Sequence, residues 1–418
     1  MPEAEHGIPL KELCPHATEV VRELQQAGYQ AYIVGGGVRD LLLGKAPKDF
    51  DVATDATPEE VHDIFPRCRL IGRRFRLAHV RKRGNLIEVA TFRGPHDGEE
   101  GNGSANGRIL RDNVFGTVEE DAIRRDFTIN AMFLDPVSGE IRDYVGGYQD
   151  LCERRLRLIG DPETRYREDP VRLLRAARFA AKLGVEPDAE SEEPIRRLAV
   201  LLEDVPPARL FEEVCKLFLT GHAMRSMESL QRFGLSSTLF PVLPESDKPG
   251  GVIIGPLLKA ALENTDQRIA EEKPVTPAFL LAALFWLPVK AGTERRMAAG
   301  ESEHEAILNA AEEVFYAQSR RTSVPKRFTA VAKQIWAIQP RFAKTSGKRW
   351  TRIFREPKFR AAYDFLLLRA VEDPALEELG AFWTQAQESR PMEAPAPAPS
   401  GPRKRRRRRP RSRNRKRA

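Results

Sequence analysis

The chain has 418 residues, enough for two or three domains, and its 41% hydrophobic and 31% charged residues are typical of a soluble globular protein. No stretch approaches the roughly 18 uncharged apolar residues of a membrane span. The N-terminus carries acidic residues and no apolar run, which argues against a secretory signal. We therefore expect a cytoplasmic protein without a transmembrane segment.

Positive charge is concentrated near the C-terminus. Residues 403–417 contain twelve Lys or Arg and no acid, so the formal charge of +8 leaves about −4 for the rest of the chain. Such a segment attracts polyanions. The cysteines, Cys14, Cys68, Cys152 and Cys215, are widely spaced and lie beside no histidine cluster. This pattern argues against a zinc site and against a disulfide framework.

The first part of the chain, from residue 20 to about 150, is predicted to mix helices and strands. An amphipathic helix over 17–28 leads into a short apolar strand at 31–34, a glycine-rich turn and a second helix. Two further runs rich in β-branched residues, 48–54 and 86–92, predict strands. Residues 94–107 contain many glycines and no apolar periodicity, which indicates a loop.

From about residue 150 to 389 the pattern changes to long helical periodicities with few strand signals. Helices without strands predict an all-α half of two packed lobes, so the fold class is α+β. The segment 391–402 alternates Pro and Ala, which favours an extended spacer. The predicted division is an extension at 1–19, a mixed domain at 20–150, helical domains at 151–225 and 226–389, and a linker with a basic tail at 390–418.

Three glycines, Gly35, Gly36 and Gly37, lie between the predicted strand at 31–34 and the helix that follows. Glycines at such a junction let backbone N–H groups approach a phosphate without a Cβ in the way. A triple glycine can also be a simple turn, so this feature alone is a weak indication.

A pair of aspartates, Asp49 and Asp51, follows within the predicted strand at 48–54. Positions i and i+2 of a strand point to the same face, so the carboxylates are expected side by side while Phe50 turns towards the core. Neighbouring carboxylates repel unless a cation lies between them, and their oxygens suit Mg²⁺ or Mn²⁺. Such a pair can hold the metals of an in-line phosphoryl transfer. The alternative is two solvated aspartates near a strand end.

Two other acids are candidates for a third catalytic carboxylate. Glu88 interrupts an apolar run that is otherwise typical of a buried strand, where an unpaired carboxylate would need a partner or a metal. Asp126 lies in the segment 124–131, which mixes charged and apolar positions unlike an ordinary surface helix. The alternative for Asp126 is a helix N-cap beside two surface arginines. The residues alone do not choose between Glu88 and Asp126.

A charged helix is predicted to begin near Pro170, which fits a first helical turn, with Asp169 as its cap. Glu168, Arg172 and Arg175 share one face, and such a face can hydrogen-bond a base edge and neutralise phosphates. An intrahelical salt-bridge ladder is the alternative. The opposite face carries an apolar stripe made of Val171, Leu174, Ala177 and Ala181.

Taken in order, GGGVRD at 35–40, the aspartate pair, RRDFTINA at 124–131 and EDPVR at 168–172 resemble the class II nucleotidyltransferases. This family contains the bacterial poly(A) polymerases and the CCA-adding enzymes. The resemblance implies a catalytic nucleotidyltransferase head with a small mixed sheet at 20–150. A helical neck that binds nucleotide and RNA would follow, and then a helical RNA-binding body.

The resemblance also implies roles for individual residues, each of which we treat as an expectation. Asp49 and Asp51 would bind the catalytic metal, and Asp126 would belong to the active site. The nucleotide would be bound at its triphosphate by Gly35, Gly36 and Arg39, near its sugar by Arg125 and Asn130, and at its base by Glu168, Asp169 and Arg172, with Arg175 on the same helix face.

Within the family, the segments at 70–80 and 160–184 resemble the poly(A) polymerase branch. This branch implies addition of AMP from ATP to RNA 3′ ends, which promotes mRNA decay, with RNA and the RNA-decay machinery as partners. We expect no DNA partner, and we expect a monomer. Ala131 stands where an A-adding enzyme can carry serine, a departure that does not decide nucleotide choice.

Two other functions stay open. A CCA-adding tRNA nucleotidyltransferase would use the same fold but accept CTP before ATP. An inactive RNA-binding protein is disfavoured by the intact aspartate pair. The tail, with Arg403, Lys404, Arg405, Arg406 and Arg407, would hold RNA near the active site without sequence preference. Its alternative is a solvated tail or one that binds ribosomes or anionic lipid.

Overall fold

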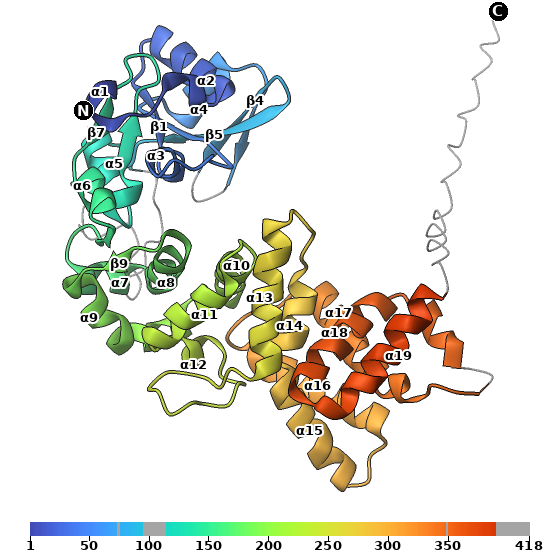
Figure 1. Ribbon diagram of the computed structural model, residues 1–418. Coiled ribbons are helices and arrows are strands. Elements are labelled where there is room, and N and C mark those ends of the chain that lie inside the picture. The colour runs from blue at the N-terminus through green and yellow to red at the C-terminus, as the bar shows by residue number, and fades with distance from the viewer. Residues whose placement is uncertain (73–75, 95–113, 348–349, 390–418) are drawn as a thin grey trace, which may run out of the picture.

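The computed structural model describes residues 1–72, 76–94, 114–347 and 350–389. A mixed α/β head (blue to teal in Figure 1) lies at one end, and the helical remainder extends from it in a curve. The fold class predicted from the sequence is confirmed. Most of the glycine-rich segment 94–107, the spacer at 391–402 and the arginines of the tail lie outside the described residues.

The head is built on a seven-stranded mixed sheet in the order β3-β4-β5-β2-β1-β6-β7. β2 and β5 pair in parallel, and every other neighbouring pair is antiparallel. The strands are β1 (Ala31–Val34), β2 (Asp51–Thr54), β3 (Cys68–Ile71), β4 (Leu77–Lys82), β5 (Asn85–Thr91), β6 (Met132–Leu134) and β7 (Ile141–Asp143). The sequence predicted β1, β2 and β5. It did not predict β3, β4, β6 and β7, whose sequences lack the β-branched runs that indicated the other three strands.

Helices cover the two faces of this sheet unequally. On one face α2 (Pro15–Gln26) and α4 (Pro58–Ile64) pack over β2 and β5, and their apolar side chains form one core with those strands. On the other face α5 (Val118–Arg124) covers only the part around Tyr32, Phe92 and Phe133. The side chains of β3, β4 and β5 on that second face stay exposed or half-buried.

Local sequence sets where these helices begin. Thr57 caps α4 by accepting a hydrogen bond from the backbone N–H of Glu60, whose carboxylate accepts one from Thr57 in return. Thr117 and Glu120 repeat this capping box at α5. The helix after the glycine turn, α3 (Gly36–Leu42), begins inside the turn itself.

The helical half begins at the head–neck junction and contains one short parallel strand pair, β8 (Arg155–Leu156) with β9 (Glu186–Pro187), which the sequence did not predict. On α8 (Val171–Leu183) the predicted apolar stripe is buried, as expected. The helix begins one residue later than predicted, with Pro170 as N-cap, while Asp169 ends the preceding helix α7 (Pro162–Glu168).

The remaining elements run from the neck into the body, where a second apolar cluster forms around Phe342, Phe359 and Trp383. They are α9 (Ala189–Leu198), η3 (Ala199–Asp204), α10 (Pro207–Phe218), α11 (Ala223–Arg232), α12 (Ser236–Leu239), α13 (Pro256–Ala270), α14 (Pro277–Leu284), α15 (Trp286–Ala298), α16 (Glu303–Ser319), α17 (Lys326–Ile338), η4 (Gln339–Ala343), η5 (Trp350–Arg355), α18 (Phe359–Glu372), η6 (Pro374–Leu376) and α19 (Glu377–Glu388). The head also carries α1 (Glu3–His6), η1 (Leu10–Glu12), η2 (Thr128–Asn130) and α6 (Gly147–Cys152). No helix in the described part of the chain is long and apolar enough to cross a membrane. The domain limits given above stay predictions.

Candidate active site

The glycine turn brings two arginines close to the backbone. Gly35 has φ +71°, which favours glycine, and a Cβ there would lie 3.4 Å from Nη1 of Arg125. A Cβ on Gly36 would lie 3.4 Å from Nη2 of Arg39. The absence of side chains at these glycines therefore leaves room for two guanidinium groups beside the start of α3.

Asp51 begins β2 and is aligned with Glu88 of the parallel neighbour β5. Residues aligned across two strands carry their side chains on the same face. The protein around Asp51 removes water from its carboxylate, and the negative charge of Glu88 adds to this effect, so its pKa rises to about 6 against the opposing charge of Arg125. Two acidic groups therefore lie close enough to affect one another.

Asp49 lies before β2 and not within it, because the strand begins at Asp51. The predicted i, i+2 alignment within one strand is therefore wrong for this pair. Asp49 is exposed, yet its charge still contributes to the raised pKa of Asp51, so the two carboxylates remain neighbours. Phe50 is half-buried against the core, as expected.

The expectation that Glu88 lies buried in its strand is also wrong, because its side chain is 49% exposed. Ile87 and Val89 face the core, while Leu86 and Glu88 face the open side of β5. Because Leu86 is apolar although it is exposed, the run 86–92 appeared from the sequence to be apolar on both faces of the strand. Oε1 of Glu88 lies 3.4 Å from Nε2 of His79 on β4.

Asp126 is held by several partners between the head and the neck. Its Oδ2 accepts a hydrogen bond of 2.6 Å from Nε of Arg175, and its Oδ1 accepts from the backbone N–H of Phe127 and from Nδ2 of Asn130. Burial by itself would raise the pKa of Asp126, but the Arg175 charge and these hydrogen bonds hold it below its usual value. It is not the N-cap of an α-helix.

Arg39 is buried and connects three elements. Its Nη1 donates to Oδ1 of Asn130 at 2.5 Å, and its Nε and Nη2 donate to Oδ1 of Asp40 at 2.8 and 2.6 Å. Its guanidinium lies 5.3 Å from the ring centre of Phe179 on α8. The arginine of the GGGVRD segment thus joins α3, η2 and the neck.

The acids of the EDPVR segment are also paired. Oε2 of Glu168 accepts from Nη1 of Arg165 at 2.8 Å and from Nη1 of Arg172 at 3.1 Å. Oδ2 of Asp169 accepts from Nη2 of Arg209 on α10 at 2.7 Å. Glu168 ends α7 whereas Arg172 and Arg175 belong to α8, so the prediction that the three share a face of one helix is wrong. The Glu168–Arg172 ion pair joins α7 to α8 and is not an intrahelical ladder, and Asp169 is bonded to α10.

A cleft of about 480 Å³ brings head and neck residues together at this place. Ten of the thirteen predicted site residues outside the tail line it, and Asp49, Glu88 and Glu168 do not. It also contains four residues that the sequence did not single out. The full lining is Gly35, Gly36, Arg39, Asp51, Arg125, Asp126, Asn130, Asp169, Arg172, Arg175, Arg178, Phe179, Lys182 and Arg209.

Seven of the lining side chains are cationic and three are acidic, which makes the cleft suited to a polyanion such as a nucleoside triphosphate. Arg178 and Lys182 follow Arg175 by three and seven positions, so the helical period of α8 could have revealed them. Arg209 comes from α10, and no sequence signal connects it with this site.

In the described part of the chain, no three His, Cys, Asp or Glu side chains are grouped closely enough to hold a metal ion by themselves. Mg²⁺ is usually held by one or two carboxylates together with substrate phosphates. Burial of the Asp51 carboxylate, together with the nearby charges of Glu88 and Asp49, raises its pKa, and a divalent cation held in this way would relieve both effects.

Comparison with solved structures identifies the fold to which the chain belongs. A Bacillus stearothermophilus CCA-adding enzyme solved in complex with CTP is 27% identical, with a TM-score of 0.60 over 89% of this chain and 83% of that chain. A CCA-adding enzyme in apo form II gives a TM-score of 0.64 at 20% identity over 93% of this chain and 87% of that chain, a likeness of fold. The chain therefore has the class II nucleotidyltransferase fold.

Relatives found by sequence similarity show which branch of this class the chain resembles more. Poly(A) polymerase I of Salmonella typhimurium is 48% identical over 94% of this chain and 86% of its own length. The enzyme of the same name from Haemophilus influenzae is 45% identical over 92% of this chain and 87% of its own. A CCA-adding enzyme of Bacillus pumilus is 38% identical over only 57% of each chain.

Family models agree with these relatives. "Poly A polymerase head domain" matches residues 31–157, "Probable RNA and SrmB- binding site of polymerase A" matches 184–246, and "Polymerase A arginine-rich C-terminus" matches 299–417. The chain belongs to the poly(A) polymerase I family.

Proposed function

We propose that the chain is a template-independent polynucleotide adenylyltransferase that adds AMP from ATP to RNA 3′ ends. One observation carries the proposal. A cationic cleft ends at Asp51, beside Glu88, in a chain that is 48% identical to a poly(A) polymerase I over 94% of its length. The cleft thus offers a binding site for the phosphates directly beside an acidic reaction centre.

In this proposal the triphosphate of ATP lies in the cleft, against the glycine turn and the cations around it. The RNA 3′-hydroxyl gives its proton to solvent as its oxygen attacks the α-phosphorus in line. A bond from the 3′-oxygen to the α-phosphorus forms, the bond to the oxygen bridging the β-phosphate breaks, and pyrophosphate leaves. The cations of the cleft stabilise the charge that develops on the leaving group.

Asp49 and Asp51 would hold the divalent cation, which we propose to be Mg²⁺ or Mn²⁺. When bound, it supplies Lewis-acid stabilisation of the attacking and leaving oxygens. We propose Glu88 as the third carboxylate, since it is aligned with Asp51 across two strands. Asp126 then acts as a positioning residue, because its oxygens are bonded to Arg175, Phe127 and Asn130.

The adenine base would meet the neck, at the junction of α7 and α8. Arg209 holds Asp169, and Glu168 and Arg172 hold one another, so the three base-facing candidates have a set orientation. Arg125 and Asn130 would serve the ribose and support Arg39. A fixed arrangement of donors and acceptors favours one base over others.

The RNA partner would be the 3′ ends of mRNA and structured RNAs, whose lengthening would bring in RNA-decay machinery. The tail, including Arg403, Lys404, Arg405, Arg406 and Arg407, would tether the RNA by its phosphates. Deleting 403–418 should raise the RNA concentration needed and flatten the salt dependence, and an unchanged salt slope would contradict the tether. We also propose that the protein is a cytoplasmic monomer.

The deciding experiment compares two RNAs and two nucleotides. Purified protein with Mg²⁺ is given labelled oligo(A) or a tRNA lacking its CCA end, with ATP or CTP alone. A long ladder on oligo(A) with ATP supports the proposal. Addition of a few residues to the tRNA that requires CTP would identify a CCA-adding enzyme. No extension in any tube would favour an RNA-binding role.

A further inference from the structure

The face of the head sheet that carries Asp51 is only partly covered by helix. α5 covers it around Tyr32 and Phe133, whereas no helix of the described residues covers the part over β3, β4 and β5. We call this part the open sheet face and define it by Arg69, His79, Arg81, Leu86 and Glu88. Arg69 and Arg81 are exposed, and Leu86 is 50% exposed.

Strand register places a row of polar side chains across this face. Arg69 is aligned with His79, His79 with Glu88, and Glu88 with Asp51. Neighbouring strands lie roughly 4.8 Å apart, so the row spans about 14 Å from the reacting carboxylates to Arg69. The row connects the candidate catalytic centre with positive charge at the edge of the sheet.

The cationic side chains of the segment from β3 to β5 lie on both faces of the sheet, some on the covered side and some on the open side. Arg76 pairs with Glu59, and Lys82 and Arg83 approach Glu19 of α2, so these cations are directed to the covered side. Within the described residues, no ion pair engages Arg69 or Arg81 on the open side. Unpaired exposed cations beside an exposed leucine suit the phosphates and sugars of single-stranded RNA.

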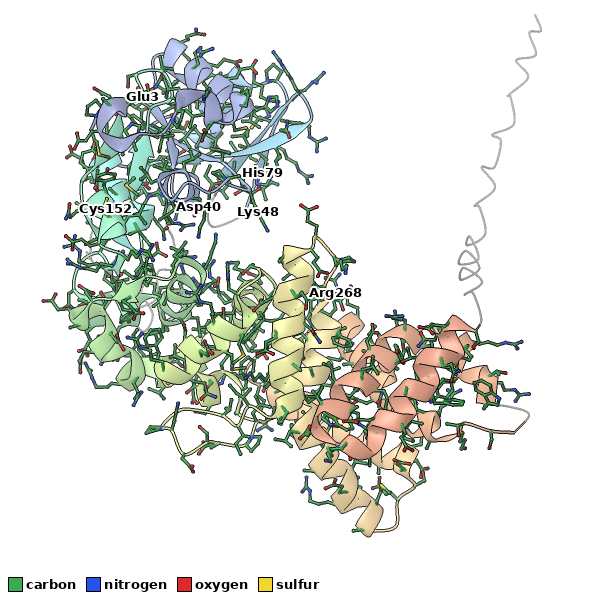
Figure 2. All side chains as sticks on the ribbon, viewed as in Figure 1. Glu3, Asp40, Lys48, His79, Cys152 and Arg268 are labelled. Atoms are coloured by element: carbon green, nitrogen blue, oxygen red, sulfur yellow. The ribbon has the colours of Figure 1, made fainter. Side chains whose placement is uncertain are left out.

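The position of the cleft gives the direction from which RNA must come. Gly35, Arg39 and Arg125 place the cleft on the β1 side of Asp51, whereas the open sheet face lies on its β5 side. In-line displacement requires the attacking oxygen opposite the leaving pyrophosphate. Figure 2 shows His79, together with Lys48 and Asp40, on the side of the head that faces the helical half.

We propose that the open sheet face binds the last nucleotides of the RNA, with Arg69 and Arg81 on their phosphates and the His79 ring beside the terminal sugar. This inference rests on the proposed function and adds to it the residues that deliver the 3′-hydroxyl to the carboxylates. Its ligand is the backbone of a single-stranded RNA end, with no base read by hydrogen bonds.

The test uses the full chain and a short oligo(A). The double variant Arg69→Ala with Arg81→Ala removes both charges, and Arg69→Lys with Arg81→Lys keeps them. Arg83→Ala is the matched control, because its side chain is 76% exposed and lies near Glu19 on the covered side. The KM values for oligo(A) and ATP are measured, and binding of dye-labelled oligo(A) without divalent ions is titrated at several salt concentrations.

We expect the alanine pair to raise the KM for oligo(A) about tenfold and to leave the KM for ATP within about twofold. Its slope of log affinity against log salt should fall by about 1.4, since each phosphate contact on a single strand contributes about 0.7. The lysine pair and Arg83→Ala should stay near the wild type. Wild-type RNA binding by the alanine pair, or an equal loss in Arg83→Ala, overturns the inference.

A failure of the proposed function looks different. If the wild-type chain does not extend oligo(A) with ATP, the assignment as an adenylyltransferase fails. The binding titrations would still report whether the open sheet face holds RNA.

Discussion

Arg175 of α8 donates a 2.6 Å hydrogen bond from Nε to Oδ2 of Asp126, which joins the neck to the head at the cleft. The other oxygen of Asp126 accepts from Asn130, whose own side-chain oxygen accepts from Arg39. A chain of charged and amide groups thus connects α3, η2 and α8. This arrangement makes Asp126 a structural link between the head and the neck.

Asp126→Asn should lower the free energy of unfolding at pH 7 by about 2 kcal/mol, less than for a fully buried pair because Arg175 is 30% exposed. The folded-state pKa of Asp126 lies below its ordinary value, so its contribution is present above pH 4 and is lost as the pH falls through that lowered pKa. Urea unfolding from pH 7 to pH 3 should show the difference shrinking. Glu193→Gln, at an exposed side chain, is the control, and a difference that grows on acidification would contradict the assignment.

Glu88→Gln should lower kcat about a hundredfold while the KM values change little, because a carboxylate that acts on the reacting groups matters mainly in the transition state. Asp126→Asn should lower kcat less. Primer extension with saturating ATP and oligo(A) measures both. The reverse ranking, with Asp126→Asn the more severe, would move the third carboxylate to Asp126. Glu59→Gln, at an exposed glutamate on α4, controls for the loss of a nearby acid.

Asp51→Asn should abolish extension and yet stabilise the metal-free protein at pH 8. The folded-state pKa of Asp51 is raised to about 6, so its favourable contribution is present below pH 3.8 and is lost as the pH rises through about 6. Melting temperatures in a chelator should therefore be higher for the variant at pH 8 and converge near pH 4. Added Mg²⁺ should raise the Tm of the wild type only. Equal Tm values at pH 8 would be incompatible with a crowded carboxylate.

Lys182→Met should raise the KM for ATP about fivefold and weaken inhibition by pyrophosphate. Nζ of Lys182 lies 3.5 Å from Oδ2 of Asp40, a loose contact that leaves its charge available to a phosphate in the cleft. Methionine keeps the apolar stem and removes the charge. Lys216→Met on α10, at a lysine that is 49% exposed, is the matched control. An unchanged KM for ATP would exclude Lys182 from the triphosphate site.

The sequence by itself determined the features that depend on neighbouring residues. The strand Ala31–Val34, the buried stripe of α8 and the glycine turn follow from local periodicity and from the freedom of glycine, and the ordered motifs identified the family. The division into a mixed head and a helical half followed for the same reason, because each element carries its own period.

Only the tertiary structure decided which distant side chains meet. The alignment of Glu88 with Asp51 depends on the register between two parallel strands, and the pairing of Asp169 with Arg209 depends on how α10 packs beside the neck. Neither contact has a local pattern, because register and helix packing are set by the whole core. Among the described residues the same core leaves the sheet face over β3, β4 and β5 without a covering helix, and the RNA end is proposed to bind there.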